Sequence, residues 1–259
     1  MYGIGKTMIK TNPVKENLKA GKPSIGVWMG LSSAAACEAE GSVGWEWLLM
    51  DAEHSQVDFG TMIECFRATQ RAGSVPIARV PWNETIWIQR TLDAGAMGLV
   101  IPMVNNKADA EFAVANTVFA PNGLRSFGGS RLIPYLEGGD YYKWCEENLV
   151  VVVQIETVEA VEKIDEIASV PGVDCCYIGP MDLMLSMGET KQGPGTKHDE
   201  AMLHVLDVCK KKGVAAGLYC FDAESTQTRI DQGWQFVNCS ADVGHLVSAS
   251  KADFDKLKY

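Results

Sequence analysis

Eight short apolar segments recur along the chain, separated by polar or amphipathic segments. Continuous apolar runs of this length are typical of strands that are buried on both faces of a parallel sheet. The predicted strands are Ser24–Met29, Trp45–Asp51, Val75–Val80, Ala96–Val104, Leu149–Glu156, Val173–Gly179, Val214–Cys220 and Gln235–Ser240.

Helical periodicity fills several of the gaps between these strands. The segments that begin at Asp58 and Asn83 each open on a residue type that caps helices, and helices are also predicted over 157–168 and 198–212. Strands alternating with helices predict a (β/α)8 TIM barrel, which typically has about 250 residues. The 259 residues contain no linker, which indicates a single domain over 1–259. A doubly wound open sheet is the alternative, but the turn after the first strand lacks GxGxxG.

The composition of the chain favours a small molecule as its binding partner. The net charge of −10 argues against nucleic acid or an anionic membrane surface. Because the chain has neither a long apolar segment nor a signal-peptide core, we expect a cytoplasmic protein. The eight cysteines include no CxxC pair and are expected to be buried, reduced thiols. Two segments rich in glycine and polar residues, 121–140 and 187–197, are predicted to be functional or interface loops.

Two carboxylates lie where predicted strands end, which is the face of a TIM barrel that carries the active site. Glu156 ends the valine-rich fifth strand, and Asp182 follows the sixth. Sequential strands lie about 4.8 Å apart, so the two charges would repel each other unless a cation lay between them. An incomplete set of oxygen ligands suits Mg²⁺ or Mn²⁺, with Co²⁺ or Zn²⁺ as alternatives. The competing interpretation is that each carboxylate caps the following helix.

Other ionisable residues are predicted at the same face. Arg79 is the only basic residue within the predicted strands, and its fork of donors suits a substrate carboxylate or a developing oxyanion. The alternative is a buried salt bridge from Arg79 to Asp51 or Glu53. His54 follows the strand that ends at Asp51 and suits general acid/base catalysis, although such a histidine can also be a surface or cap residue.

Five sequence blocks lie in order along the chain: WLLMDAEHS (47–55), PIARVPWN (76–83), LDAGAMGLVIPMV (92–104), VQIET (153–157) and YIGPMDLMLSMG (177–188). Together they resemble the HpcH/HpaI aldolase family, the class II, metal-dependent pyruvate aldolases that include 4-hydroxy-2-oxoheptanedioate and 2-dehydro-3-deoxyglucarate aldolases. The resemblance implies a (β/α)8 barrel that cleaves a 4-hydroxy-2-keto acid to pyruvate, or a close relative, and an aldehyde.

The resemblance also implies roles for the catalytic and metal-binding residues. Glu156 and Asp182 correspond to the metal ligands. Arg79 corresponds to the group that contacts the ketone or enolate oxygen, and His54 with Asp51 to the acid/base pair.

Further positions are implied to bind substrate or a second subunit. Gln154 corresponds to a neighbour of the metal, and backbone amides near Met181 and Asp182, after Gly179-Pro180, correspond to those that hold the pyruvate carboxylate. Asp93 corresponds to a residue at the subunit interface. The implied assembly is a homo-oligomer, a hexamer built as a trimer of dimers with exchanged terminal helices.

Alternatives and one departure accompany this interpretation. A metal-enolate lyase of citrate lyase β or malyl-CoA lyase type would act on an acyl-CoA thioester, but no basic track for CoA phosphates is evident. A non-catalytic barrel scaffold would have lost one of the charged residues, and all are present. A Schiff-base mechanism is disfavoured because no lysine lies in a predicted strand. The segment 218–221 is bulkier than expected of the family and is predicted to narrow the aldehyde pocket.

Overall fold

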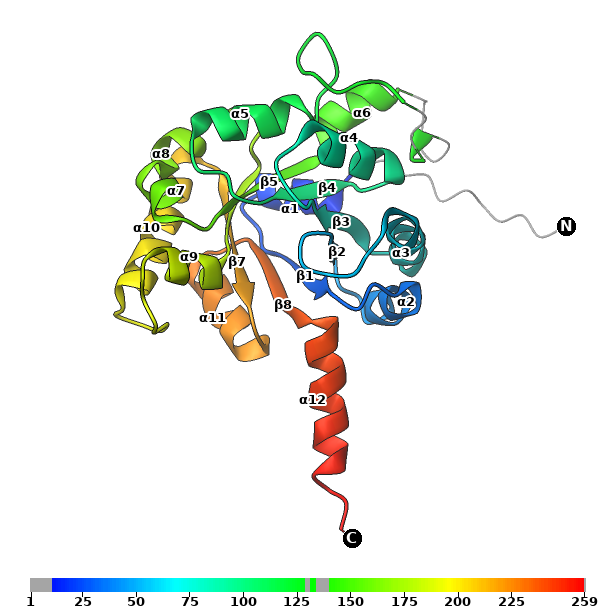
Figure 1. Cartoon of the computed structure of the whole chain (residues 1–259), viewed down its shortest axis with the longest axis vertical. Coiled ribbons are helices and arrows are strands. Elements are labelled where there is room, and N and C mark those ends of the chain that lie inside the picture. The colour runs from blue at the N-terminus through cyan, green and yellow to red at the C-terminus, as the bar shows by residue number, and fades with distance from the viewer. Residues whose placement is uncertain (1–10, 129–130, 134–139, 259) are drawn as a thin grey trace, which may run out of the picture.

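A computed structural model describes residues 11–128, 131–133 and 140–258. Eight parallel strands form a closed barrel in sequence order, which confirms the predicted fold as a single domain (Figure 1). The strands are β1 (Ser24–Met29), β2 (Trp47–Asp51), β3 (Val75–Arg79), β4 (Gly98–Ile101), β5 (Val150–Ile155), β6 (Cys175–Ile178), β7 (Ala215–Cys220) and β8 (Phe236–Ala241). All eight predicted strands are therefore confirmed, with small differences at their ends.

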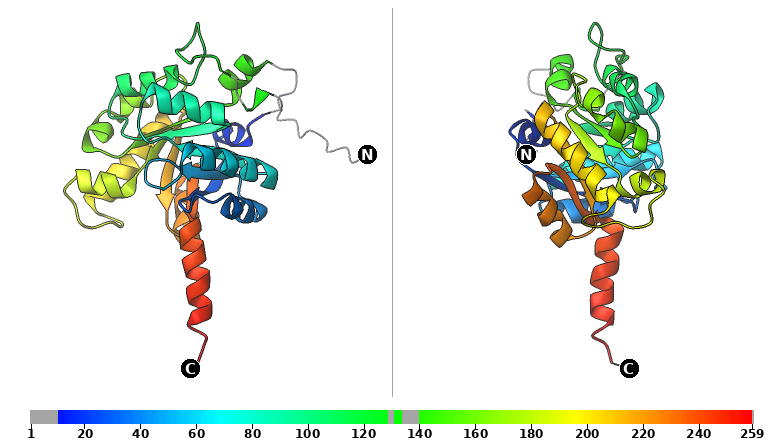
Figure 2. Two further views of the ribbon diagram at one scale, coloured as in Figure 1. Left: turned by 45° about the vertical axis from the view of Figure 1, so that its right-hand side comes forward. Right: turned by 90° about the vertical axis from the view of Figure 1, so that its left-hand side faces the viewer.

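Helices surround the barrel, and α12 extends away from it in every ribbon view (Figures 1 and 2). The helices are α1 (Pro13–Lys19), α2 (Ala34–Ser42), α3 (Phe59–Ala72), α4 (Thr85–Ala94), α5 (Lys107–Ala115), α6 (Tyr141–Asn148), α7 (Val158–Glu162), α8 (Ile164–Ile167), α9 (Pro180–Ser186), α10 (Lys197–Lys212), α11 (Ala223–Gln232) and α12 (Asp242–Phe254). Within the described ranges, none of the helices has both the length and the apolar character needed to span a bilayer.

Two of the four helix predictions need correction. The side chain of Asp58 accepts a hydrogen bond from the amide of Thr61 and caps α3 as predicted. Asn83 does not cap α4, because Glu84 occupies the N-cap position and the side-chain amide of Asn83 instead donates to the carbonyl of Asp109 at 3.0 Å. The helix predicted over 157–168 is divided into α7 and α8 at Lys163, whose backbone departs from helical angles.

The two predicted loops are consistent with the structure where it describes them. Residues 121–128 form no helix or strand longer than an isolated bridge, and residues 187–196 are irregular up to the start of α10. Residues 129–130 and 134–139 of the first loop lie outside the described residues.

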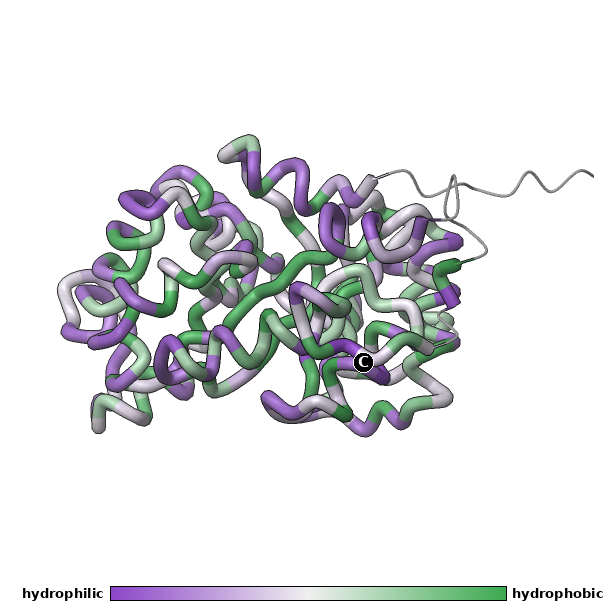
Figure 3. Tube along the Cα trace, turned by 90° about the horizontal axis from the view of Figure 1, so that it is seen from above, coloured by the Kyte–Doolittle hydropathy of each residue, from purple (hydrophilic) through white to green (hydrophobic). Residues whose placement is uncertain are grey.

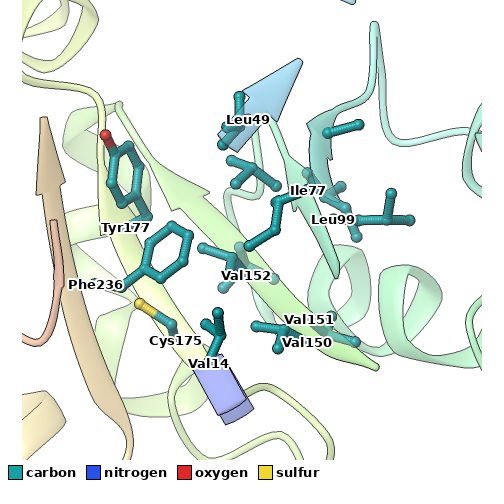
Figure 4. Packing of buried hydrophobic residues seen from close by; sticks show 14 of the residues in the cluster. Val14, Leu49, Ile77, Leu99, Val150, Val151, Val152, Cys175, Tyr177 and Phe236 are labelled. Atoms are coloured by element: carbon teal, nitrogen blue, oxygen red, sulfur yellow. The ribbon is translucent and has the colours of Figure 1, made fainter. Parts of the chain in front are cut away.

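Helix α1 closes the end of the barrel where the strands begin. Lys15 Nζ lies 3.0 Å from Asp174 Oδ2, and Asn12 Nδ2 donates to the carbonyl of Met97 at 2.9 Å. Met97 precedes β4 and Asp174 precedes β6, so both contacts are made at the strand N-termini. Val14 is fully buried beside the barrel residues (Figure 4). This closure leaves the opposite end of the barrel open for a site.

The barrel interior is packed with side chains. Figure 3 shows a hydrophobic stretch crossing the middle of the molecule, and Figure 4 shows valine, leucine and aromatic side chains meeting inside the barrel. The rings of Trp47 and Phe236 stack with their centroids 4.3 Å apart. A Cβ on Gly26 would lie 2.1 Å from the ring of Trp47, so only glycine fits there. Close packing of this kind holds the strand ends in fixed relative positions.

Candidate active site

A cavity of about 310 Å³ opens where the strands end. Most of the residues predicted for the site line it, namely Asp51, His54, Arg79, Gln154 and the segment from Gly179 to Asp182. The structure therefore brings these residues together at one end of the barrel, and Glu156 is buried next to the lining residue Gln154.

The two-residue repeat of β-strands explains which side chains reach this cavity. Alternate residues of a barrel strand face the interior, so the last inward residue of each strand lies at the opening. The lining contains one such residue from β1, β2, β3, β5, β6 and β7: Trp28, Asp51, Arg79, Gln154, Tyr177 and Tyr219. Rigid strands thus position six of the twelve lining residues, and the other six come from the turn after β2, from residues 179–182 and from the residue after β7.

Arg79 and Asp51 form a buried ion pair beside the cavity. Arg79 Nε donates to Asp51 Oδ1 at 2.9 Å and Nη2 donates to Oδ2 at 2.6 Å, while Nη1 lies 3.0 Å from Glu53 Oε2. The salt bridges considered as an alternative role for Arg79 are therefore present, although the same side chain also lines the cavity. Burial alone would lower the pKa of Arg79, but its hydrogen bonds with Asp51 raise it, so the guanidinium stays charged.

Glu156 is a buried carboxylate with a shifted pKa. Only 3% of the residue is exposed, and its Oε1 accepts a hydrogen bond from the amide of Met103 at 2.7 Å. Its Oε2 accepts one from Gln154 Nε2 at 2.6 Å. Burial raises the pKa of Glu156 to about 7, and the negative charges of Glu53 and Asp182 act in the same direction. A cation at this position would offset the cost of burying the charged carboxylate and the repulsion between the carboxylates.

Neither metal-ligand candidate is a helix cap. Thr157 caps α7 with its side chain, and Gly179 occupies the N-cap position of α9, which leaves Asp182 exposed in the first turn. The alternative that these two carboxylates serve as caps is therefore wrong. Glu156 reaches the site from the end of β5 and Asp182 from α9, which follows β6.

The surrounding polar atoms fit a divalent cation. Gln154 Oε1 is buried and has no hydrogen-bond partner, although the same residue lines the cavity. Within the described ranges no group of three or more His, Cys, Asp or Glu side chains is gathered closely enough to hold a metal. Two carboxylates with water or substrate oxygens completing the coordination shell are typical of Mg²⁺ and Mn²⁺ rather than of a closed structural site.

Gly179 allows the β6–α9 turn to pass close to the proposed metal ligands. A Cβ at this position would lie 2.7 Å from Gln154 Nε2 and 2.8 Å from Glu156 Oε2. Any larger residue would therefore displace one or both of these side chains. The glycine of the YIGPMD block is required here by close approach rather than by backbone conformation.

His54 lies at the edge of the cavity, and its ring does not contact Asp51. The side chain is 64% exposed, and Nε2 lies 3.9 Å from Glu53 Oε1. The carboxylate of Asp51 accepts hydrogen bonds from Arg79 and from Trp28 Nε1, the latter at 3.1 Å. It also accepts a hydrogen bond from the backbone amide of His54 at 3.3 Å. The expected ring-to-Asp51 pair is thus replaced by a backbone contact, because other donors occupy the oxygens of Asp51.

Aromatic residues form a part of the lining that the sequence indicates only partly. Trp28 stacks with Tyr177 at 5.8 Å and meets Tyr219 edge-on at 5.6 Å, and the guanidinium of Arg79 lies 4.9 Å from a Trp28 ring centroid. The bulk of Tyr219 and Phe221 is evident from the sequence, whereas the sequence pattern does not assign Trp28 and Tyr177 to the site. Counting inward positions back from each strand end would have found both.

Asp93 lies apart from the cavity lining. Its Oδ1 is 2.8 Å from Arg125 Nη2, and its side chain is one third exposed on α4. Within this chain Asp93 therefore orders the segment that carries Arg125, and its role at a subunit interface stays a prediction.

Comparison with known proteins identifies relatives of nearly the same length. A family model described as HpcH/HpaI aldolase/citrate lyase matches residues 24–249. A hydroxypyruvate/pyruvate aldolase from Paraburkholderia phytofirmans is 34% identical over 255 residues, covering 96% of this chain and 98% of that protein. A 5-keto-4-deoxy-D-glucarate aldolase from Shigella boydii is 33% identical over 248 residues, covering 95% and 96% respectively.

A solved structure extends the likeness to three dimensions. The crystal structure of an HpcH/HpaI aldolase/citrate lyase family protein from Burkholderia cenocepacia superposes with a TM-score of 0.89 at 33% identity. The match covers 95% of this chain and 99% of that one. The family match over residues 24–249 includes every strand that contributes to the cavity.

Proposed function

Because the chain belongs to the HpcH/HpaI aldolase/citrate lyase family, we propose that it is a divalent-metal-dependent aldolase that cleaves a 4-hydroxy-2-keto acid to pyruvate and an aldehyde. The observation that carries this proposal is that Asp182 and charged Arg79 line one cavity, while buried Glu156 lies next to it, 2.6 Å from Nε2 of the lining residue Gln154. The cavity volume of about 310 Å³ is at the lower limit of ligand pockets, which favours a small keto acid over an acyl-CoA thioester.

The residues match the chemical needs of retro-aldol cleavage. Breaking the C3–C4 bond needs a base for the C4 hydroxyl and positive charge near the oxygen of the developing enolate. When bound by Glu156 and Asp182, Mg²⁺ or Mn²⁺ would supply a Lewis acid for the keto acid. Gln154 fixes Glu156 through its Nε2 and offers a free Oε1 toward water or ligand.

Arg79 supplies fixed positive charge close to the reacting atoms. A guanidinium has five N–H donors, and contacts with Asp51 and Glu53 leave some of them for a substrate oxygen. Since Asp51 locks its orientation, Arg79 needs little rearrangement as charge develops on that oxygen.

Proton transfer and carboxylate binding are assigned to the cavity edge. The exposed ring of His54 accepts the proton of the C4 hydroxyl, and Glu53 at 3.9 Å stabilises the resulting imidazolium. The first backbone amides of a helix have no partners within the helix, so those of Met181 and Asp182 are available to the pyruvate carboxylate.

Two measurements test this function. Metal-stripped protein would be incubated with pyruvate in D₂O, with Mg²⁺ or Mn²⁺ restored, and exchange of the methyl protons followed by NMR. Pyruvate release from 4-hydroxy-2-oxopentanoate would be followed in parallel through lactate dehydrogenase. We expect both reactions to require the ion and to stop in excess EDTA. Full turnover in EDTA would contradict the metal assignment, and the absence of both reactions with every ion would contradict the function.

A homo-oligomer is proposed alongside this activity. Helix α12 extends from the barrel (Figure 2). It exposes Val243, Leu246, Val247 and Phe254 to solvent within the single chain. Apolar side chains gathered on one projecting helix favour burial against another subunit. Light scattering coupled to size exclusion should give the mass of a hexamer, and a monomer at micromolar concentration would contradict the proposal.

A further inference from the structure

The cavity lining has two chemically different groups of side chains. One group is charged and comes from the ends of β2 and β3, from His54 and from Asp182 in α9. The other group consists of three aromatic rings and a thioether, and we call it the acceptor wall: Trp28, Met181, Tyr219 and Phe221. We propose that the acceptor wall binds the carbon chain of the aldehyde, and that the enzyme prefers uncharged aldehydes with an aromatic or bulky apolar group over aldehydes that carry a carboxylate. This inference rests on the proposed function and specifies its second substrate.

The rings of the acceptor wall pack edge to face. Tyr219 meets Trp28 with the ring centroids 5.6 Å apart at 67°, and it meets Phe221 at 5.1 Å and 65°. Tyr219 is the last inward residue of β7, and Phe221 follows two positions later on the same side. This geometry is the preferred one for aromatic groups, and a ligand ring can extend it.

The outer part of the acceptor wall is exposed in the absence of ligand. Phe221 is 53% exposed and Met181 is 47% exposed, although both line the cavity. Large apolar groups that border a polar cavity gain most when a ligand removes them from water. Methionine also adapts its shape to different apolar partners. An apolar substituent on the aldehyde therefore has a surface that it can cover.

The charges of the cavity disfavour a second carboxylate. Among the described residues of the lining, the basic side chains are Arg79 and His54, while Asp51 and Asp182 are acidic. Arg79 is paired with Asp51 and with Glu53, and its remaining N–H donors are assigned to the oxygen of the keto acid, so it adds no net positive charge for the carboxylate of an aldehyde. A carboxylate at the acceptor wall would lose hydration without gaining a cation.

Tyr219 adds no charge of its own to this wall. Burial raises the pKa of Tyr219, so its phenol stays neutral at any pH at which the enzyme would be assayed. The ring therefore acts as an apolar surface, and its hydroxyl is not needed for the proposed preference.

The test compares matched aldehydes in the synthetic direction with pyruvate and Mg²⁺ or Mn²⁺. Succinic semialdehyde and its methyl ester differ mainly in charge. Benzaldehyde and 3-phenylpropanal test whether the enzyme accepts aromatic aldehydes. We expect kcat/KM for the methyl ester and the aromatic aldehydes to exceed that for succinic semialdehyde by at least about tenfold, the factor that corresponds to 1.4 kcal/mol. Equal or faster reaction of succinic semialdehyde would overturn the inference.

Substitutions in the acceptor wall test whether its residues cause this aldehyde preference. Tyr219→Ala and Phe221→Ala should lower kcat/KM for aromatic aldehydes about tenfold, well beyond any change in pyruvate methyl exchange. Tyr219→Phe should retain the preference because only the hydroxyl is removed. Phe112→Ala, which removes a similarly exposed ring from α5 outside the cavity lining, is the matched control and should change neither reaction. Unchanged aldehyde selectivity in both alanine variants would contradict the role of the wall.

The pyruvate exchange measurement separates the two levels of the proposal. Methyl exchange combined with a preference for carboxylate-bearing aldehydes would overturn only the inference about the acceptor wall. Loss of methyl exchange and of aldol addition with every ion would overturn the proposed function, and the inference with it.

Discussion

Asp51 and Arg79 are register partners on β2 and β3, and their side chains form a two-point ion pair with N–O distances of 2.9 and 2.6 Å. Both residues are more than nine-tenths buried. Paired, charge-assisted hydrogen bonds of this kind fix orientation as well as charge. The pair therefore makes Arg79 a preorganised cation beside the cavity, and the next two predictions depend on it.

Replacing Arg79 with lysine keeps the charge but removes the fork. We expect Arg79→Lys to lower kcat for pyruvate release by roughly 10²- to 10³-fold, as for loss of one preorganised donor. Steady-state kinetics with the lactate dehydrogenase assay would measure this change. An unchanged kcat would assign Arg79 a purely structural role.

Replacing Asp51 with asparagine leaves Arg79 without its main partner. We expect a loss of about 3–5 kcal/mol in the free energy of unfolding near neutral pH. Burial raises the pKa of Asp51, but the Arg79 hydrogen bonds outweigh it, and the net pKa is lowered. The stabilisation is thus present above the unfolded pKa of about 3.9 and is lost as pH falls toward the lower folded value. Urea titrations at neutral and acidic pH should show the wild-type advantage shrinking in acid.

Replacing the proposed metal ligands should remove stabilisation by metal. For the wild type, Mg²⁺ or Mn²⁺ at 100 times its Kd should add about 2.7 kcal/mol to the free energy of unfolding. Glu156→Gln and Asp182→Asn should each abolish most of this increase in a thermal shift measurement. Met184→Leu, on the same helix as Asp182 but buried and apolar, serves as a control. A full metal-dependent shift in both ligand variants would place the ion elsewhere.

Removing the His54 ring should change the pH profile of the reaction. Because histidine is the side chain that usually changes charge between pH 5 and 8, His54→Ala should lower kcat by about 10²- to 10⁴-fold and flatten the acidic limb of the profile. The variant should fold normally, since the ring is largely exposed. A profile identical to that of the wild type would exclude His54 as the acid/base group.

A methyl group on Gly179 should displace the side chains of Gln154 and Glu156. The added Cβ would lie within 2.8 Å of polar atoms of Gln154 and Glu156. We expect Gly179→Ala to weaken metal affinity about 10- to 100-fold, as for loss of a group that orients a ligand. Calorimetric titration with Mn²⁺ would measure it. Gly60→Ala on the exposed side of α3 should leave the affinity unchanged.

The sequence predicted the barrel because its strands are continuous apolar runs and its helices show periodicity. It also located Glu156, Asp182 and Arg79, since a charged side chain at the end of an apolar strand is costly to bury and therefore points to a site at the barrel opening. The apolar pattern alone does not assign Trp28 and Tyr177 to the site, because an aromatic residue within an apolar strand has the same pattern whether it fills the core or lines a cavity, and only its place as the last inward residue distinguishes it. The partner of His54 depends on competition for the oxygens of Asp51, which no sequence pattern records.

The separation of Tyr219 and Phe221 from the proposed metal-binding residues affects how such an enzyme can diverge. Among the hydrogen bonds and ring pairs of the described residues, Tyr219 and Phe221 make none with Glu156 or Gln154, and they come from the end of β7, which β6 separates from β5. Mutations at 219 and 221 can therefore retarget the enzyme to new aldehydes while the pyruvate half of the reaction is inherited intact. A small library at these two positions is a direct starting point for directed evolution.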